Sequence, residues 1–306
     1  MAPAGAARAA GGAIPRLRIF IPANEGGGWD QTGRALGAAM VASGAASEVM
    51  YENLGGKGGV PGLARYVERY GSEPDAMLVG GMVMVGAVAL HKPPVTLARV
   101  APVARLTSDY GVLVVRADSP VMTPKDLMAQ LRGQPDKTPI AGGSAGGVDH
   151  MFAGMLARVA GRTADLVYQP YPGGAQVVEA VLGGKAVAGI SGHSEFSEDL
   201  AKGRLRAIGV SSKRPFLGIP SFKEQGVDVD LDNWRGVFTG QDVSADHRRA
   251  LLDAVRRAVA SEVWQKAVKR NNWDPFWQDG ADFQNFVQIE ASMADVLIYL
   301  LKLNKG

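Results

Sequence analysis

The chain has 306 residues, a length that suits one large domain or two domains of medium size. Hydrophobic residues make up 46% and charged residues 21%, which excludes a disordered, collagen-like or disulfide-scaffold protein. Cysteine is absent, so disulfides, thiolate metal sites and cysteine nucleophiles are excluded as well. The formal net charge is only +3, no basic run concentrates it, and aromatic residues are 7%, so we expect no nucleic-acid partner.

Two segments were candidates for a signal peptide or a membrane-spanning helix, and neither has the features that such a segment requires. Residues 1–13 are almost entirely Ala, Gly and Pro and lack the apolar core of a signal peptide. They fit either a remnant around a cleavage site or an ordinary disordered N-terminus. The uncharged stretch Ala76–Leu90 is shorter than the about 20 residues of a membrane-spanning helix. Its three glycines indicate a buried strand, a turn and a short buried helix.

The first third of the chain alternates short apolar runs with helical periodicity. Strands are expected at 17–22, 48–53 and up to Gly80, and helices at 30–40 and 60–70. This βαβαβ order predicts a parallel sheet covered by helices.

A second α/β unit follows a long extended segment at 103–116. Thr123 and Pro124 have the residue types of an N-cap and a first helical position. Beyond them we expect a strand at 137–141, a helix at 149–160, a strand at 166–168, a helix at 174–182, and a further alternation through 186–190, 195–202 and 205–210.

After a second extended segment, 233–239, the pattern becomes wholly helical, with helices at 245–259, 262–271 and 282–303. Three helices in a row need a partner for their apolar faces, and the first sheet is the simplest one. We therefore expect a disordered segment 1–16, a first lobe of 17–108 with 237–306, and a second lobe of 109–236. The two extended crossings would form a two-strand hinge.

Two glycine-rich turns are the strongest candidates for a binding site. In the first, Asn24, Gly26, Gly27, Gly28 and Trp29 join a strand end to a helix start. Free backbone N–H groups and the helix dipole favour an anion at such a place. Asp30 is expected to cap its own helix. The alternative is a flexible loop with a solvent-exposed tryptophan.

The second turn, Gly142 to His150, repeats the strand–glycine–helix order in the second unit and has the same anion-binding chemistry. Two such turns on opposing lobes could hold one multiply charged ligand between two positive helix ends.

The same turn also matches the nucleophile elbow of α/β-hydrolases, Gly142-x-Ser144-x-Gly146. An enzyme of that type needs a later acid and histidine, and only His150, His193 and His247 follow. No oxyanion segment of the His-Gly-Gly-Gly type is present. In so glycine-rich a chain the match is weak, so a serine hydrolase is kept only as the alternative function.

Several ordered motifs together resemble one known family. They are Pro-Ala-Asn-x-Gly-Gly-Gly-Trp-Asp at 22–30, Asn-x-x-Gly-x-Gly-Gly at 53–59, Gly-Gly-Ser-Ala-Gly-Gly-x-Asp-His at 142–150, Gly-Gly at 183–184, Leu-Arg-Ala at 205–207 and Asn-Trp-Arg-Gly-Val-Phe at 233–238. The chain from about 17 to 290 is similar to the solute-binding proteins of tripartite tricarboxylate transporters, a bacterial periplasmic family.

The resemblance implies an α/β fold of the periplasmic binding protein type, a type II clamshell. Each lobe would be a mostly parallel sheet flanked by helices. It implies a non-enzymatic receptor that captures a small tri- or dicarboxylate and delivers it to integral-membrane transporter subunits. No cofactor and no metal are implied, and we expect a monomer in the periplasm in its mature form. The implied ligand contacts are Asn24, Gly26, Gly27, Gly28, Trp29, Ser144, Ala145, Gly146, His150, Gly173, Gly174 and Ser191.

Three positions bear on the ligand. Trp29 after the glycines is similar to the citrate-type branch of the family. Lys57 and Glu25 depart from it, because relatives usually carry a small residue and a proline there.

Overall fold

The computed structural model describes residues 12–302, which form two compact units. The first unit consists of residues up to Gly81, Lys92–Ser108 and Trp234–Glu290. The second consists of Met82–His91, Asp109–Asn233 and residues from Ala291 onward. The units differ from the lobes expected from sequence because 82–91 and the residues from 291 group with the second one. The expected lobe boundaries and two-strand hinge stay predictions.

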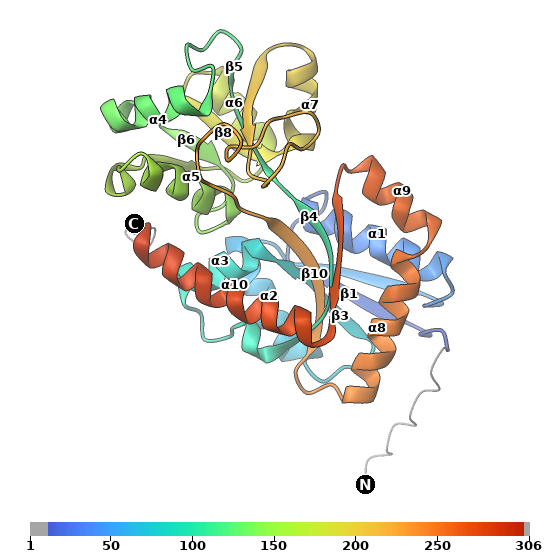
Figure 1. The fold of residues 1–306 in the computed structure, drawn as a ribbon. Helices are drawn as coiled ribbons and strands as arrows, with labels where there is room; N and C mark the ends of the chain where they lie inside the picture. The colour runs from blue at the N-terminus through green and yellow to red at the C-terminus, as the bar shows by residue number, and fades with distance from the viewer. Residues whose placement is uncertain (1–11, 303–306) are drawn as a thin grey trace. The chain divides into compact units, whose positions relative to one another are not determined.

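The first unit is built on a six-stranded sheet in the order β11-β4-β10-β3-β1-β2 (Figure 1). Its strands are β1 (Leu17–Ile21), β2 (Val49–Asn53), β3 (Ala76–Gly81), β4 (Val100–Asp109), β10 (Asn233–Gly240) and β11 (Asp274–Asp279). Its helices are α1 (Gly28–Ala42), α2 (Val60–Tyr70), α8 (Ala245–Val259) and α9 (Glu262–Arg270). Both α8 and α9 pack against α1 of the same unit.

The sequence of the central strands explains why they are buried and pair in parallel. The run Leu-Arg-Ile-Phe-Ile of β1 is almost wholly buried, and so is all of β3. Continuous apolar runs of this kind are typical of parallel strands covered on both faces. β1 pairs in parallel with β2 and with β3. β10 then runs antiparallel to β3, and β11 runs antiparallel to β4.

The second unit contains a five-stranded sheet in the order β7-β6-β8-β5-β9. Its strands are β5 (Gly111–Arg116), β6 (Ile140–Gly142), β7 (Tyr168–Pro170), β8 (Ala188–Gly192) and β9 (Leu205–Val210). The associated helices are α3 (Met82–His91), α4 (Pro124–Gly133), α5 (Val148–Val159), α6 (Gly174–Leu182) and α7 (His193–Ala201). The long helix α10 (Gly280–Leu300) starts in the residues of the first unit and ends in those of the second. β6, β7 and β8 are parallel, and β5 runs antiparallel to both β8 and β9.

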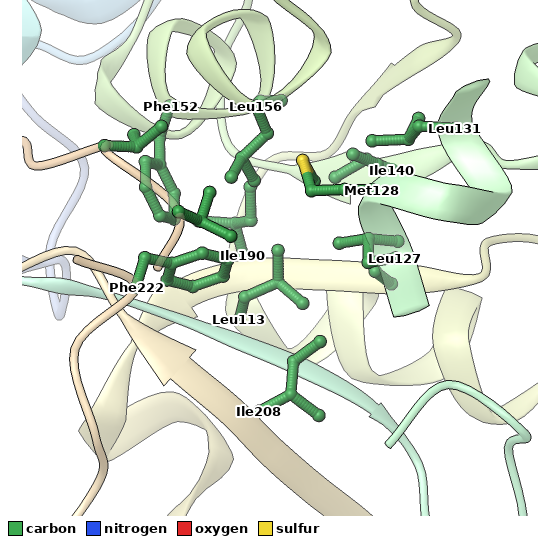
Figure 2. Close-up of a cluster of buried hydrophobic side chains, with 14 of the residues drawn as sticks. Leu113, Leu127, Met128, Leu131, Ile140, Phe152, Leu156, Ile190, Ile208 and Phe222 are labelled. Atoms are coloured by element: carbon green, nitrogen blue, oxygen red, sulfur yellow. The ribbon is translucent and has the colours of Figure 1, made fainter. Parts of the chain in front are cut away.

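Alternation along β5 supplies both faces of this second sheet. Leu113 points into a cluster with Ile140, Ile190 and side chains of α4 and α5, as Figure 2 shows. Val112 and Val114 point into a second cluster with residues of α6 and α7. Because both faces are buried, the sheet needs helices on each side, which is the layered architecture expected from sequence.

Two expected elements were wrong. The strand expected at 137–141 is reduced to Ile140–Gly142, and Pro135–Lys137 forms a 3-10 turn instead. The C-terminal region is not wholly helical, because β11 lies between α9 and α10. Pro275 within β11 hides the strand from sequence analysis, and its position at the edge of the sheet makes the proline tolerable.

The N-cap expected at Thr123 is confirmed, and it is part of a capping box with Asp126. The Thr123 hydroxyl accepts from the Asp126 N–H, and the Asp126 carboxylate accepts from the Thr123 N–H. Within residues 12–302, none of the helices has the length and apolar character that crossing a membrane requires.

We predict that Phe222→Ala destabilises the protein by about 3–5 kcal/mol, because it opens a cavity in a closed core. Phe222 is fully buried, and its ring meets that of Phe152 edge-on at 5.2 Å between centroids. Denaturant-induced unfolding of the purified variant measures the change. The matched control is Phe276→Ala, at a side chain that is 44% exposed, which should cost about 1 kcal/mol or less. Equal losses in the two variants would contradict this account of the core.

Candidate functional site

The candidate residues gather at one kind of place, the carboxyl end of a parallel strand. In the first unit, Asn24 to Trp29 follow β1, and the glycine turn at 55–59 follows the neighbouring strand β2. In the second unit, Ser144 to Gly146 follow β6, Gly173 follows β7, and Ser191 lies at the end of β8. Since β6, β7 and β8 are parallel, these three turns share one edge of their sheet. Ligands of open α/β sheets bind at such edges.

Five helices that start at these edges begin in the same unusual way. Their N-cap residues are all glycine, and none makes a side-chain cap hydrogen bond: Gly27 (α1), Gly59 (α2), Gly147 (α5), Gly173 (α6) and Gly192 (α7). By contrast, α4, α8 and α9 are capped by the hydroxyls of Thr123, Ser244 and Ser261. A glycine cap leaves the first-turn N–H groups without an internal acceptor. The edges therefore present polarised N–H groups to an external acceptor.

Asp30 organises the first glycine turn but does not cap α1. The N-cap is Gly27, and the buried Asp30 carboxylate reaches back to accept from the Gly26 N–H at 2.9 Å. It also accepts from Arg34 Nε at 2.9 Å and from Asn53 Nδ2 at 2.9 Å. Burial raises the pKa of Asp30, but these hydrogen bonds outweigh it and hold the pKa below its usual range. The expectation that Asp30 is the cap was wrong, because an acid three positions into the helix can reach past the cap.

Arg235 closes the turn from behind. Its guanidinium donates to the Gly28 carbonyl at 3.3 Å, and a Cβ on Gly28 would lie 2.9 Å from the Arg235 Nη2. The ring of Trp273 lies 5.5 Å from the same guanidinium. Trp29 is only 7% exposed, so it is not the solvent-exposed tryptophan of the flexible-loop alternative. Its contact with a ligand stays a prediction.

Close packing joins the first two turns of the first unit. A Cβ on Gly55 would meet both the backbone and the side chain of Asn24. Gly56, Gly58 and Gly59 have positive φ angles of 110°, 61° and 90°, as does Lys57 at 44°. Glycine adopts such angles without strain, whereas Lys57 does so at some cost. Lys57, which departs from the family pattern, thus holds a strained backbone conformation in a turn otherwise built from glycine.

The second glycine turn is also held by an acid from its own helix. Asp149 lies at the second position of α5, and its carboxylate accepts from the Gly143 N–H at 2.9 Å. The Tyr168 hydroxyl donates to the Gly143 carbonyl at 2.7 Å. Burial, with a smaller contribution from the nearby carboxylates of Asp109 and Glu195, raises the pKa of Asp149 to about 7, although the hydrogen bond from the Gly143 N–H acts to lower it. Asp149 therefore titrates near neutral pH.

His150 completes this turn in its neutral form. Its ring stacks on Tyr168 with 4.2 Å between centroids, and its Nδ1 accepts from the Gly146 N–H at 3.0 Å. Burial lowers the pKa of His150 to about 4. With Nδ1 as the acceptor, the proton of the neutral ring lies on Nε2. His150 can thus offer one donor to a ligand without adding charge.

Helix α3 packs closely against the second glycine turn. A Cβ on Gly86 would meet the Gly146 carbonyl and would lie 2.8 Å from the Met151 Cε. Gly146 has a φ of 77°, and its Cα faces the Leu90 side chain. The second turn is consequently shaped by α3, a contact that no sequence motif announces.

Acidic side chains lie close to all three turns of the second edge. Asp149 lies over Gly143, a Cβ on Gly174 would meet Glu195, and a Cβ on Gly192 would lie 3.4 Å from Asp109 Oδ2. Sequence analysis missed Asp149, Glu195 and Tyr168. Asp149 could have been found from its position. It is an acidic residue at the second position of a helix that follows a glycine turn, where its carboxylate can accept from an N–H group of that turn.

The geometry does not favour the hydrolase. Ser144 is exposed, and across residues 12–302 no hydrogen bond joins its hydroxyl to a histidine. His150, which is closest in sequence, uses its Nδ1 on the Gly146 N–H instead of on the serine. Within the same residues, no group of three or more His, Asp and Glu side chains could hold a metal ion.

Comparison with known proteins assigns the chain to a family. The family described as "Tripartite tricarboxylate transporter family receptor" matches residues 36–303, so the chain belongs to it. The chain is 25% identical over 257 residues to a UPF0065 protein of Pseudomonas sp. strain P51, covering 82% of this chain and 75% of the relative. It is 23% identical over 197 residues to a UPF0065 protein of Cupriavidus necator, covering 63% of this chain. That match spans 59% of the Cupriavidus protein.

Solved structures share the fold. MatC from Rhodopseudomonas palustris, with bound malate, superposes with a TM-score of 0.76 at 20% identity, covering 92% of this chain and 99% of MatC. A second R. palustris protein, with adipate, has a TM-score of 0.81 at 17% identity, covering 94% and 97%. The architecture is therefore that of two-lobed periplasmic binding proteins, as the sequence predicted.

We predict opposite pH dependences for Asp149 and His150. Because the folded-state pKa of Asp149 is raised, the folded state binds the extra proton, and stability falls as pH rises from about 4 to 7. Because the folded-state pKa of His150 is lowered, stability rises as pH rises from about 4 to 6.5.

The measurement is the unfolding free energy of wild type, Asp149→Asn and His150→Gln between pH 4 and 8. Wild type should lose roughly 2–4 kcal/mol relative to Asp149→Asn over the first window and gain roughly 2–3 kcal/mol relative to His150→Gln over the second. Parallel curves for all three proteins would show that neither group titrates abnormally.

Proposed function

We propose that this protein is a periplasmic receptor that captures a small tri- or dicarboxylate, of the citrate type, and delivers it to the membrane subunits of a tripartite tricarboxylate transporter. Family membership supports the receptor class. The related structures with bound malate and adipate support a carboxylate as the ligand. That one ligand is held by both lobes stays a prediction, as does the tricarboxylate.

The observation that carries the proposal is the set of five glycine-capped helix starts. Serine and threonine cap the helices elsewhere, so the chain has capping residues available and omits them at the strand ends. An ionised carboxylate accepts from several N–H groups at once and also interacts favourably with the positive end of the helix dipole. Each helix end contributes on the order of 0.3–1 kcal/mol per charge when exposed, and more when water is excluded.

We propose two roles for the residues of the candidate ligand site. The N–H groups of Gly26 and Gly146 are used inside their own turns, by Asp30 and His150. In our proposal these two glycines shape the turns. The donors to the ligand are then the N–H groups of Gly28, Trp29 and Ala145, with the Ser144 hydroxyl and the His150 Nε2 beside them. The other proposed contacts are Asn24, Gly27, Gly173, Gly174 and Ser191.

Backbone donors explain why a receptor and not an enzyme is favoured. Such donors bind and orient an anion, but they include neither a nucleophile nor a base. Within residues 12–302, no histidine is hydrogen-bonded to the Ser144 hydroxyl to activate it, and membership of a receptor family supports the same conclusion. The hydrolase alternative has no further observation in its favour.

The test is a thermal-shift screen against citrate, tricarballylate, succinate, malate, adipate and glutamate, followed by calorimetry. A ligand at a hundred times its dissociation constant adds about 2.7 kcal/mol to the folded state, enough to raise the melting temperature by several degrees. A shift limited to tricarboxylates supports the citrate type. Stabilisation only by dicarboxylates keeps the receptor and moves the ligand. No shift with any acid contradicts the proposal.

Gly27→Val and Gly173→Val should each abolish the shift, because a side chain at either N-cap blocks the approach of a carboxylate. These glycines are suited to the test because both have extended φ angles and a Cβ would meet its nearest neighbour only at 3.4 and 3.3 Å. Folding should survive in both variants. Gly133→Val is the matched control, since a Cβ there has nothing within 4 Å and lies on α4, away from the strand ends. Unchanged ligand affinity in both cap variants would exclude this site.

Ser144→Ala should weaken binding of the identified acid by roughly 1–3 kcal/mol, the loss expected when a hydroxyl donor to a buried carboxylate is removed. Calorimetry measures the change. Wild-type protein should also resist labelling by a fluorophosphonate, a probe of activated serines. Labelling of wild type that Ser144→Ala removes would instead establish the hydrolase.

A further inference from the structure

In residues 12–302, one edge strand lacks the protection that the other three edge strands have. Edge strands carry unpaired N–H and C=O groups, which proteins usually protect with proline, a bulge or a covering segment. β11 has Pro275 and a break in register, and β7 ends at Pro170. In β9, Val210 is hydrogen-bonded to the segment 220–222. β2 (Val49–Asn53) contains neither proline nor glycine, and it pairs with β1 without a break in register.

The open hydrogen-bonding groups of β2 belong to particular residues. The Glu48 C=O and the Leu54 N–H are hydrogen-bonded to β1, at 2.9 and 3.0 Å. Backbone groups alternate in direction along a strand, so those of Val49, Tyr51 and Asn53 point away from β1. Among residues 12–302, β1 is the only strand that pairs with β2. An added strand would therefore find the donors and acceptors of three residues at this edge.

A hollow of about 410 Å³ lies beside β2, within the first unit. Arg18, Met50 and Ala76 line it, and they are aligned in register on β1, β2 and β3. Tyr70 and Pro74 add further apolar surface. Aligned residues on neighbouring strands have their side chains on the same face of the sheet. A strand added beyond β2 would therefore continue this row and place one side chain next to Met50, at the hollow.

The charge that is left without a partner in the hollow is negative. Arg16 Nε lies 3.0 Å from the Glu48 carboxylate, and Arg18 Nη1 lies 3.6 Å from that of Glu52. Glu73 also lines the hollow and is exposed, and it has no ion-pair partner among the residues that the structure describes. An arginine or lysine suits such a place, because its apolar stem can lie on the apolar wall while its charged end reaches the carboxylate.

We propose that the edge of β2 is a docking site for an extended segment of a partner protein. The segment adds a strand to the first sheet and places an arginine or lysine beside Glu73. In strand addition, main-chain hydrogen bonds give affinity and side-chain pockets give specificity. The two features select this occupant, because an extended chain matches the open groups of β2 and a cation complements Glu73. Arg18 and Ala76 lie near the amino ends of β1 and β3, whereas the glycine turns follow carboxyl ends, so the hollow is distinct from the candidate ligand site.

The first experiment measures the binding of synthetic peptides to the full chain by fluorescence anisotropy. The probe is a fluorescein-labelled peptide of seven residues, alternating threonine and valine with an arginine at the centre. Wild type should bind it with a dissociation constant below about 1 mM. A peptide with glutamate at the centre should bind at least tenfold more weakly. A peptide N-methylated at alternate amides cannot pair as a strand and should not bind. No binding of the arginine peptide at 1 mM, or equal binding of the N-methylated one, would overturn the proposal.

The second experiment locates the site with variants of the chain. Val49→Pro removes one outward N–H without removing a hydrogen bond to β1, so it should weaken binding of the arginine peptide at least tenfold. Val49→Ala keeps that N–H and should bind as wild type does. Glu73→Arg should reverse the preference between the arginine and glutamate peptides. Glu68→Arg, at an exposed acid of α2 outside the hollow, should not. Circular dichroism checks the fold of each variant.

Normal binding by Val49→Pro, or an unchanged preference in Glu73→Arg, would place the peptide elsewhere and overturn the proposal. Sedimentation velocity of the chain alone, up to about 200 μM, tests the other occupant of an open edge, a second copy of β2. Wild type should stay monomeric. A wild-type dimer that Val49→Pro abolishes would assign the edge to self-association instead of to a partner.

Discussion

The constraint on which this structure depends is the unsatisfied N–H groups at the start of each helix. An α-helix cannot satisfy the donors of its own first turn, and a protein must either cap them or leave them for something else. This chain does both, and it sorts the two solutions by place. Helices that do not follow a parallel strand are capped by Thr123, Ser244 and Ser261, whereas those that begin at the carboxyl ends of the parallel strands start from glycine. Parallel strands then bring the uncapped starts to one edge of each sheet.

Leaving donors uncapped requires that the turn itself be held in shape by other means. In each unit a carboxylate from the first turn of the helix reaches back to one glycine N–H, Asp30 to Gly26 and Asp149 to Gly143. The two acids nonetheless have opposite electrostatic settings. Asp30 lies with Arg34 and Asn53, and its pKa is lowered, whereas Asp149 lies in a desolvated site near other acids, and its pKa is raised. The charge of the acid in the first turn is therefore fixed near neutral pH, whereas that of the acid in the second turn titrates there.

Sequence alone predicted most of the fold and the positions of the turns, because both depend on local signals. Apolar runs located β1 and β3, glycine clusters located the strand ends, and Thr123 followed by Pro124 located the start of α4. The failures have physical causes. β11 contains Pro275 and depends on its edge position, which the sequence does not show. The Asp30 carboxylate accepts from the N–H of Gly26, the residue before the N-cap Gly27, and the sequence does not show this contact. The supports at Arg235, Gly86 and Tyr168 come from elements distant in sequence, and no local pattern marks them.

The glycine caps also bear on how such proteins diverge. A donor on the backbone is inherited with the path of the chain, whereas a side-chain donor is lost by a single substitution. Receptors of this architecture can consequently exchange most of their residues while the N–H groups at the strand ends keep their positions. A TM-score of 0.76 at 20% identity, over nearly the whole of both chains, is the relationship that this kind of inheritance allows. If the turns hold the ligand as we propose, new ligands can be accommodated by changing the few side chains around them, without rebuilding the helices that supply the positive ends of their dipoles.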